Sequence, residues 1–157
     1  MRVSVEVEDS SWRALPELEA LTREAVVAAL LEELPQQIPV EVALLFTGDA
    51  AIAEINSEWR GQNKPTNVLS FPAPEDMPLP EGENRPLGDI VLAFGVISRE
   101  AREQGKSLRD HTAHLIVHGV LHLLGYDHET DAEAEDMEHR EVQILKGMGI
   151  SDPYERH

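Results

Sequence analysis

Three histidines have the spacing of a metal site in the segment His118-Gly-Val-Leu-His122-Leu-Leu-Gly-Tyr-Asp-His128. His118 and His122 lie in an apolar run, so a helix there places both imidazoles on one face, one turn apart. Gly125 follows the last apolar residue and favours the left-handed conformation that ends a helix and reverses the chain. The reversal brings His128 back toward the other two. Three neutral imidazoles with an open fourth position are typical of a catalytic zinc ion, which predicts a metal-dependent hydrolase.

Two further histidines, His111 and His114, precede this pair at helical spacing. Four imidazoles on one helix face would be costly to bury without partners. We take His118, His122 and His128 as the ligands, and expect His114 to support a ligand, contact a substrate phosphate or pack in the core. Ring nitrogens that do not bind metal need carbonyl or carboxylate acceptors. One Zn²⁺ per chain is expected, and Ni²⁺ or Cu²⁺ would also bind such a site.

The same histidine spacing occurs in the metzincin proteases, which carry a glutamate directly after the first histidine. Gly119 stands at that position here. The glutamate is the general base for the metal-bound water, and without it peptide hydrolysis loses roughly 10²–10⁴-fold. Zn²⁺ itself still lowers the pKa of its water to about 7. Cleavage of a phosphodiester depends more on neutralising charge on the phosphoryl oxygens, so the glycine favours that reaction over a peptidase.

Composition limits the class of protein. The chain has 157 residues and no cysteine, which excludes a thiol nucleophile and a cysteine-ligated zinc. No apolar run approaches the ~18 residues of a membrane span. The first ten residues alternate and carry acids, unlike a signal peptide. We expect one domain over residues 1–157, in the cytoplasm and without membrane association.

The net charge of −17 argues against a general nucleic-acid binder. The basic residues are nevertheless concentrated in the middle of the chain, where seven of the thirteen lie: Arg60, Lys64, Arg85, Arg99, Arg102, Lys106 and Arg109. Before Arg60 the chain holds twelve acidic residues and three basic ones. A basic middle that faces a polyanion and an ordinary solvated surface are equally good interpretations of this pattern.

The strands that must position these side chains follow from hydrophobic periodicity. Alternation over residues 2–8 predicts a half-buried strand, and the nearly continuous apolar run 40–46 predicts a central one. Residues 67–71 and 89–94 are predicted as two further strands. The segment Pro72–Leu87 between them holds five of the ten prolines, which cannot donate to a strand ladder, so a long surface loop is predicted there.

Helices are predicted from periodicity and from capping residues. Residues 16–34 have the spacing of an amphipathic helix. Thr47 or Asp49 is predicted to cap a short helix. Residues 96–104 form another helix, which Gly105 closes.

Capping boxes at residues 107–110 and 130–133 begin the histidine helix and the last helix. The last helix has an apolar face that includes Met137, Ile144, Leu145 and Met148. Four strands and about five helices predict a single α+β domain with a small mixed four-stranded sheet. The metal site is predicted on the histidine helix and the turn after it.

Three blocks of sequence occur together in this chain. They are the histidine segment above, Arg60-Gly-Gln-Asn-Lys-Pro-Thr-Asn-Val-Leu-Ser-Phe-Pro72, and Leu87-Gly-Asp-Ile-Val91. From about Ile52 to the end of the last predicted helix, the chain resembles the YbeY family of bacterial rRNA maturation factors and single-strand-specific endoribonucleases. The three ligand positions show no departure from the family pattern.

The resemblance implies that His118, His122 and His128 hold zinc and that Arg60 is a required arginine near the metal. It implies single-stranded RNA as substrate, maturation of the 3′ end of small-subunit rRNA, and ribosome quality control. Small-subunit ribosomal proteins and an assembly GTPase are the implied partners.

Arg60 also makes chemical sense beside a metal, because a guanidinium binds a phosphate bidentately and offsets developing charge. Without the resemblance, Arg60 would be better interpreted as a surface arginine just after a helix. With it, Arg60 and His118 are the predicted catalytic residues, and Lys64 and His114 are further candidate substrate contacts. Asp89 and Asp127 are candidate acceptors for a ligand histidine, or local strand and turn residues. Two hypotheses stay beside the nuclease: a metallopeptidase, and a non-catalytic ribosome assembly factor with a structural metal, whose acidic charge would suit basic ribosomal proteins.

Overall fold

The computed structural model describes residues 2–34, 39–74, 78–79 and 82–154. Its strands form one four-stranded sheet in the order β1-β2-β4-β3. The strands β1 (Arg2–Val7), β2 (Val40–Thr47) and β4 (Arg85–Ala93) are parallel, and β3 (Val68–Pro72) pairs antiparallel with β4 at one edge. The predicted mixed sheet of an α+β domain is confirmed.

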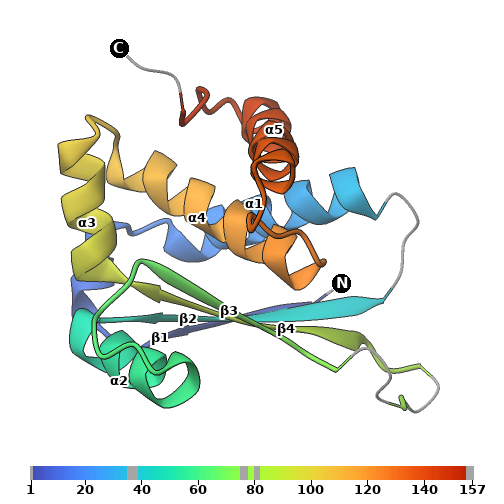
Figure 1. Ribbon diagram of the computed structural model, residues 1–157, viewed down its shortest axis with the longest axis horizontal. Helices are drawn as coiled ribbons and strands as arrows, with labels where there is room; N and C mark the ends of the chain where they lie inside the picture. The colour runs from blue at the N-terminus through green and yellow to red at the C-terminus, as the bar shows by residue number, and fades with distance from the viewer. Residues whose placement is uncertain (1, 35–38, 75–77, 80–81, 155–157) are drawn as a thin grey trace.

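Five α-helices and one short 3₁₀ helix accompany the sheet in the described part of the chain. They are η1 (Ser10–Ala14), α1 (Leu18–Glu33), α2 (Asp49–Arg60), α3 (Phe94–Glu103), α4 (Leu108–Leu123) and α5 (Asp131–Gly147). Figure 1 shows α1, α4 and α5 on one face of the sheet and α2 on the other, with α3 at the end of the sheet. The histidine helix α4 therefore lies between the sheet and other helices.

Helix α4 begins at the predicted cap, where the Asp110 N–H donates to Ser107 Oγ at 3.0 Å. Eleven of its sixteen residues are buried, as expected for a helix with packing partners on several sides. Gly119 allows this close packing, since a Cβ there would lie 3.0 Å from Ile90 Cγ2 and 3.3 Å from Ser70 Oγ. The glycine after His118 thus brings α4 against β3 and β4.

The predicted bounds of the loop Pro72–Leu87 are wrong at both ends. Pro72 is the last residue of β3, and β4 already begins at Arg85. Pro86 is tolerated because it lies beyond the last β3–β4 pair and beside a register shift in β2, where a missing N–H costs little. Residues 75–77 and 80–81 of the predicted loop lie outside the described residues. At the other end of β4, Phe94 starts α3 instead of continuing the strand.

The predicted cap of α2 is also wrong. The N-cap is Gly48, which has no side chain to offer. The Asp49 carboxylate instead accepts the Val96 N–H at 3.0 Å and pairs with Arg99 at 3.1 Å, so it caps the neighbouring helix α3. Thr47 contributes its carbonyl, which accepts the Trp12 indole N–H at 2.9 Å.

The 3₁₀ helix η1 was not predicted. It exists to bury Trp12, whose ring meets Phe46 and Phe94 edge-on, with centroids 5.0 and 5.3 Å apart. This cluster joins the N-terminal segment to β2 and to the start of α3.

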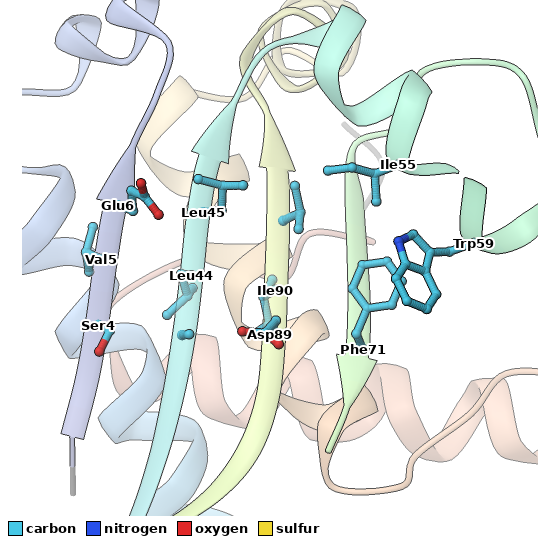
Figure 2. A pocket seen from close by; sticks show the side chains of 12 residues that line it. Ser4, Val5, Glu6, Leu44, Leu45, Ile55, Trp59, Phe71, Asp89 and Ile90 are labelled. Atoms are coloured by element: carbon cyan, nitrogen blue, oxygen red, sulfur yellow. The ribbon is translucent and has the colours of Figure 1, made fainter. Parts of the chain in front are cut away.

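The face of the sheet away from α4 is only partly covered by α2. A pocket of about 500 Å³ lies there. Figure 2 shows side chains that line it, including Ile55 and Trp59 of α2 and Phe71 and Asp89 of the sheet. Asp89 is exposed on this outer face, so it does not orient a ligand histidine. No helix in the described ranges is both long and apolar enough to cross a membrane.

Candidate metal centre

His118, His122 and His128 come together as the sequence predicts. Each residue offers one ring nitrogen, and these three atoms all lie within 4.8 Å of one another. The Nε2 atoms of His118 and His122 are 3.0 Å apart. The ring centroid of His128 lies 5.9 Å from the ring centroid of His118 and 5.1 Å from that of His122. Nitrogens that converge in this way fit the three-imidazole donor set of a zinc ion that keeps a fourth position open.

The turn after α4 brings His128 into the group. Gly125 has a φ of 101°, the left-handed conformation predicted for it. The Gly125 N–H donates to the His122 carbonyl at 3.0 Å and the Tyr126 N–H to the Leu121 carbonyl at 3.1 Å, which is a Schellman motif. Asp127 Oδ1 accepts the His128 N–H at 2.8 Å, so Asp127 shapes the turn.

The environment of His122 favours the form that binds metal. Burial lowers the pKa of His122, and the neighbouring His118 and His128 rings lower it further. The ring therefore stays neutral to lower pH than a free imidazole, with a lone pair available to a cation.

A buried carboxylate on α5, Glu141, contacts His118 and was not predicted from the sequence. Its side chain is 1% exposed, Oε1 lies 3.2 Å from His118 Nδ1, and Oε2 contacts His114 Nε2. The Tyr154 hydroxyl donates to the same carboxylate at 2.9 Å. Burial works to raise the pKa of Glu141, but the hydrogen bonds from His114 and His118 outweigh it and hold the pKa at about 2.

One signal for Glu141 was present in the sequence. An acid stands inside the apolar stripe that Met137, Ile144, Leu145 and Met148 form on the last helix. A charged residue on the buried face of a helix needs a partner, and the histidine helix carries several imidazoles that can donate to it.

The two earlier histidines of α4 point elsewhere. His114 is buried against Glu141, and its Nε2 lies 3.2 Å from the Tyr154 hydroxyl. His111 Nε2 lies 3.0 Å from Glu100 Oε1, and Glu100 also accepts from the Asn67 side chain at 3.0 Å. Neither ring lines the cleft that holds the other three. Of the three roles predicted for His114, burial and the contact with Glu141 agree both with support of a ligand and with packing in the core, whereas the ring does not line the cleft where a phosphate would bind.

Arg60 lines the same cleft as the three histidines. The cleft has a volume of about 720 Å³ and lies between the end of α2, the β3 strand and the turn after α4. Arg60 is exposed, and Gly61 closes α2 directly after it with a φ of 67°. Lys64 is exposed but does not line the cleft, and its carbonyl accepts the Asn56 side-chain N–H at 2.9 Å.

An α+β domain with a three-histidine centre at the end of a buried helix is the class of protein that this geometry defines. A family model described as Endoribonuclease YbeY matches residues 4–149. A protein of that name from Allorhizobium ampelinum is 51% identical over 161 residues, 97% of this chain and 93% of that one. Another from Bartonella bacilliformis is 48% identical and covers 97% of this chain and 96% of its own length. The chain belongs to the YbeY family.

A solved structure supports the fold over nearly the whole chain. The solution structure of a Thermotoga maritima protein superposes with a TM-score of 0.55 at 25% identity, covering 98% of this chain and 99% of that one.

Acid is expected to destabilise the protein partly through His111. Burial lowers the pKa of His111 below 6.5, although the hydrogen bond with Glu100 opposes this. Below that pH the unfolded chain binds more protons than the folded one, so stability falls as pH drops through the lowered pKa, by at most about 1.4 kcal/mol per pH unit for one group.

Denaturant unfolding at about pH 7.5 and 5.5 measures this effect, because these values bracket the free imidazole pKa. His111→Gln is expected to lose less stability than the wild type on acidification. His139→Gln, on an exposed residue of α5, serves as the control and should match the wild type. Equal losses in all three proteins would contradict the prediction.

Proposed function

We propose that this protein is a metal-dependent endoribonuclease that cleaves single-stranded RNA. The observation that carries the proposal is that three converging histidine nitrogens and an exposed arginine line one cleft. The name of the family supports RNA as the substrate.

The residues of the cleft have two proposed roles, binding of the metal ion and binding of the substrate phosphate. His118, His122 and His128 would hold Zn²⁺, which when bound supplies Lewis-acid activation of water or of a phosphoryl oxygen. The Arg60 guanidinium binds the non-bridging oxygens of the scissile phosphate and offsets the charge that develops on them. Its rigid pair of donors also fixes the orientation of the phosphate in the cleft.

The proposed biological role follows from the family resemblance. It is maturation of the 3′ end of small-subunit rRNA and ribosome quality control, in the cytoplasm. Small-subunit ribosomal proteins and an assembly GTPase are the proposed partners. The acidic charge of −17 suits contact with basic ribosomal proteins.

Metal removal tests the proposed activity. Protein treated with a chelator and then dialysed is expected to lose cleavage of a single-stranded rRNA 3′ fragment, and added Zn²⁺ is expected to restore it. Metal content is measured on the same samples. Undiminished cleavage by metal-free protein would reject the proposed centre, and no cleavage by zinc-loaded protein would favour the non-catalytic assembly factor.

The surroundings of Gly119 and the position of Glu141 argue against the metallopeptidase hypothesis. A glutamate at position 119 would need space that β4 occupies, because even a Cβ there lies 3.0 Å from Ile90 Cγ2. Glu141 does not replace the missing base, since it is buried on the Nδ1 side of His118 and does not line the cleft. Gly119→Glu is therefore expected to destabilise the fold without producing peptidase activity.

A further inference from the structure

We propose that Glu141 and Tyr154 position His118, so that the segment after α5 sets the metal affinity of the centre. This inference rests on the proposed function, because it concerns the ligand set of that same site. Glu141 and Tyr154 are positioning residues here, and neither lines the cleft.

The first step is the orientation of the His118 ring. Its Nδ1 lies 3.2 Å from Glu141 Oε1, while its Nε2 lies 3.0 Å from His122 Nε2 on the other side of the ring. A carboxylate accepts only, so it stabilises the tautomer with the proton on Nδ1. That tautomer presents the Nε2 lone pair to the position where the three nitrogens converge. A negative acceptor also makes the imidazole a stronger ligand.

The second step is what holds Glu141 itself. A buried carboxylate needs several donors, and this one contacts His114 as well as His118. The Tyr154 hydroxyl completes the set, at 3.1 Å from Oε1 and 2.9 Å from Oε2. Burial raises the pKa of Tyr154, so the hydroxyl keeps its proton and remains a donor.

The third step is the fold of the segment after α5. Ile150 is buried in the core, and Asp152 Oδ1 accepts the Tyr154 N–H at 2.8 Å in a local turn. The Tyr154 ring packs edge-on against His114 with centroids 5.4 Å apart. These contacts return the chain to α4 and place the Tyr154 hydroxyl beside Glu141. Through Tyr154, the segment after the last helix thereby contacts Glu141, the carboxylate beside His118.

Metal affinity is the quantity that these contacts control. Loss of the carboxylate partner of a ligand histidine typically costs roughly 10–100-fold in affinity. The loss of Zn²⁺ affinity in Glu141→Gln is expected to lie in that range, because the amide keeps the size of the carboxylate but loses its charge. Tyr154→Phe removes only one hydroxyl and is expected to cost less. Because Tyr154 acts through Glu141, the double variant should bind no more weakly than Glu141→Gln alone.

Zn²⁺ affinity is measured on the full-length protein without RNA, by competition with a chromophoric chelator. Glu100→Gln is the matched control, because Glu100 also accepts from a histidine of α4, His111, which is not a ligand. The control is expected to bind Zn²⁺ like the wild type. Tyr154 is partly exposed, so Tyr154→Phe keeps the proposal testable if Glu141→Gln does not fold.

A second readout separates positioning from stability. Nitrogen NMR of the metal-free protein is expected to show the His118 proton on Nδ1 in the wild type and a shift toward the Nε2-protonated form in Glu141→Gln. Folded variants that bind Zn²⁺ within about twofold of the wild type, far less than a lost partner costs, would overturn the inference and leave the proposed function standing. A wild type that binds no Zn²⁺ would overturn both.

Discussion

His128→Ala is expected to lose Zn²⁺ binding and RNA cleavage while keeping its fold. The side chain is exposed on the turn between α4 and α5, so its removal leaves no cavity. Two imidazoles remain, both on α4, and they bind Zn²⁺ less well than three that converge. The loss of affinity should exceed the roughly 10–100-fold that follows from losing only a partner of a ligand.

His118→Ala is expected to lose the same activity at a greater cost in stability. It also removes a hydrogen-bond partner of the buried Glu141, and an unsatisfied buried group costs about 1–3 kcal/mol. Cleavage of a single-stranded rRNA 3′ fragment, Zn²⁺ content and denaturant unfolding are compared for both variants. His139→Ala, on an exposed residue of α5, controls for loss of an imidazole. Cleavage by His128→Ala at the wild-type rate would contradict the proposed centre.

The convergence of the three histidines could be predicted because their relation is local. A spacing of four residues on a helix and one left-handed glycine determine where His118, His122 and His128 lie, and neither depends on the rest of the fold. Glu141 could not be placed in the same way. Its contact with His118 depends on how α5 packs on α4, which hydrophobic periodicity does not specify.

The errors in the predicted cap of α2 and in the predicted loop Pro72–Leu87 also arise from tertiary contacts that local sequence does not specify. Asp49 has the residue type of a cap for its own helix, but its carboxylate caps α3, because the fold brings the start of that helix to it. Prolines argued for a loop through Leu87, but β4 tolerates Pro86 where β3 no longer pairs with it. In both cases the residue type had the expected local preference, for capping a helix or for interrupting a strand. Contacts with a distant part of the chain decided which helix was capped and where the strand began.

The α+β class was predictable because helices occur both between strands and clustered after the last strand. The side of the sheet on which each helix packs was not. The outer face shows this, since Trp59 and Arg60 are consecutive in α2 yet line two different hollows, one on the outer face and one beside the three histidines. Consecutive helical side chains point about 100° apart, which allows the last turn of α2 to face both.

Arg60→Ala is expected to lower the cleavage rate by roughly 10²–10³-fold, the usual cost of one donor to the charge that develops in a transition state. Zn²⁺ affinity should not change, because Arg60 is not among the three converging residues that could hold the ion. Arg60→Lys should recover part of the loss, since it keeps the charge but not the paired donors. Arg102→Ala, at an exposed arginine in the last turn of α3, is the matched control and should cleave like the wild type.

The kinetics of Arg60→Ala distinguish two roles for the guanidinium. If Arg60 stabilises charge only in the transition state, kcat and kcat/KM fall together; if it binds the phosphate equally well throughout, KM rises and kcat stays. The proposed role requires the first pattern. An unchanged kcat with normal Zn²⁺ content would assign Arg60 to substrate binding alone and leave the three histidines as the catalytic part of the cleft.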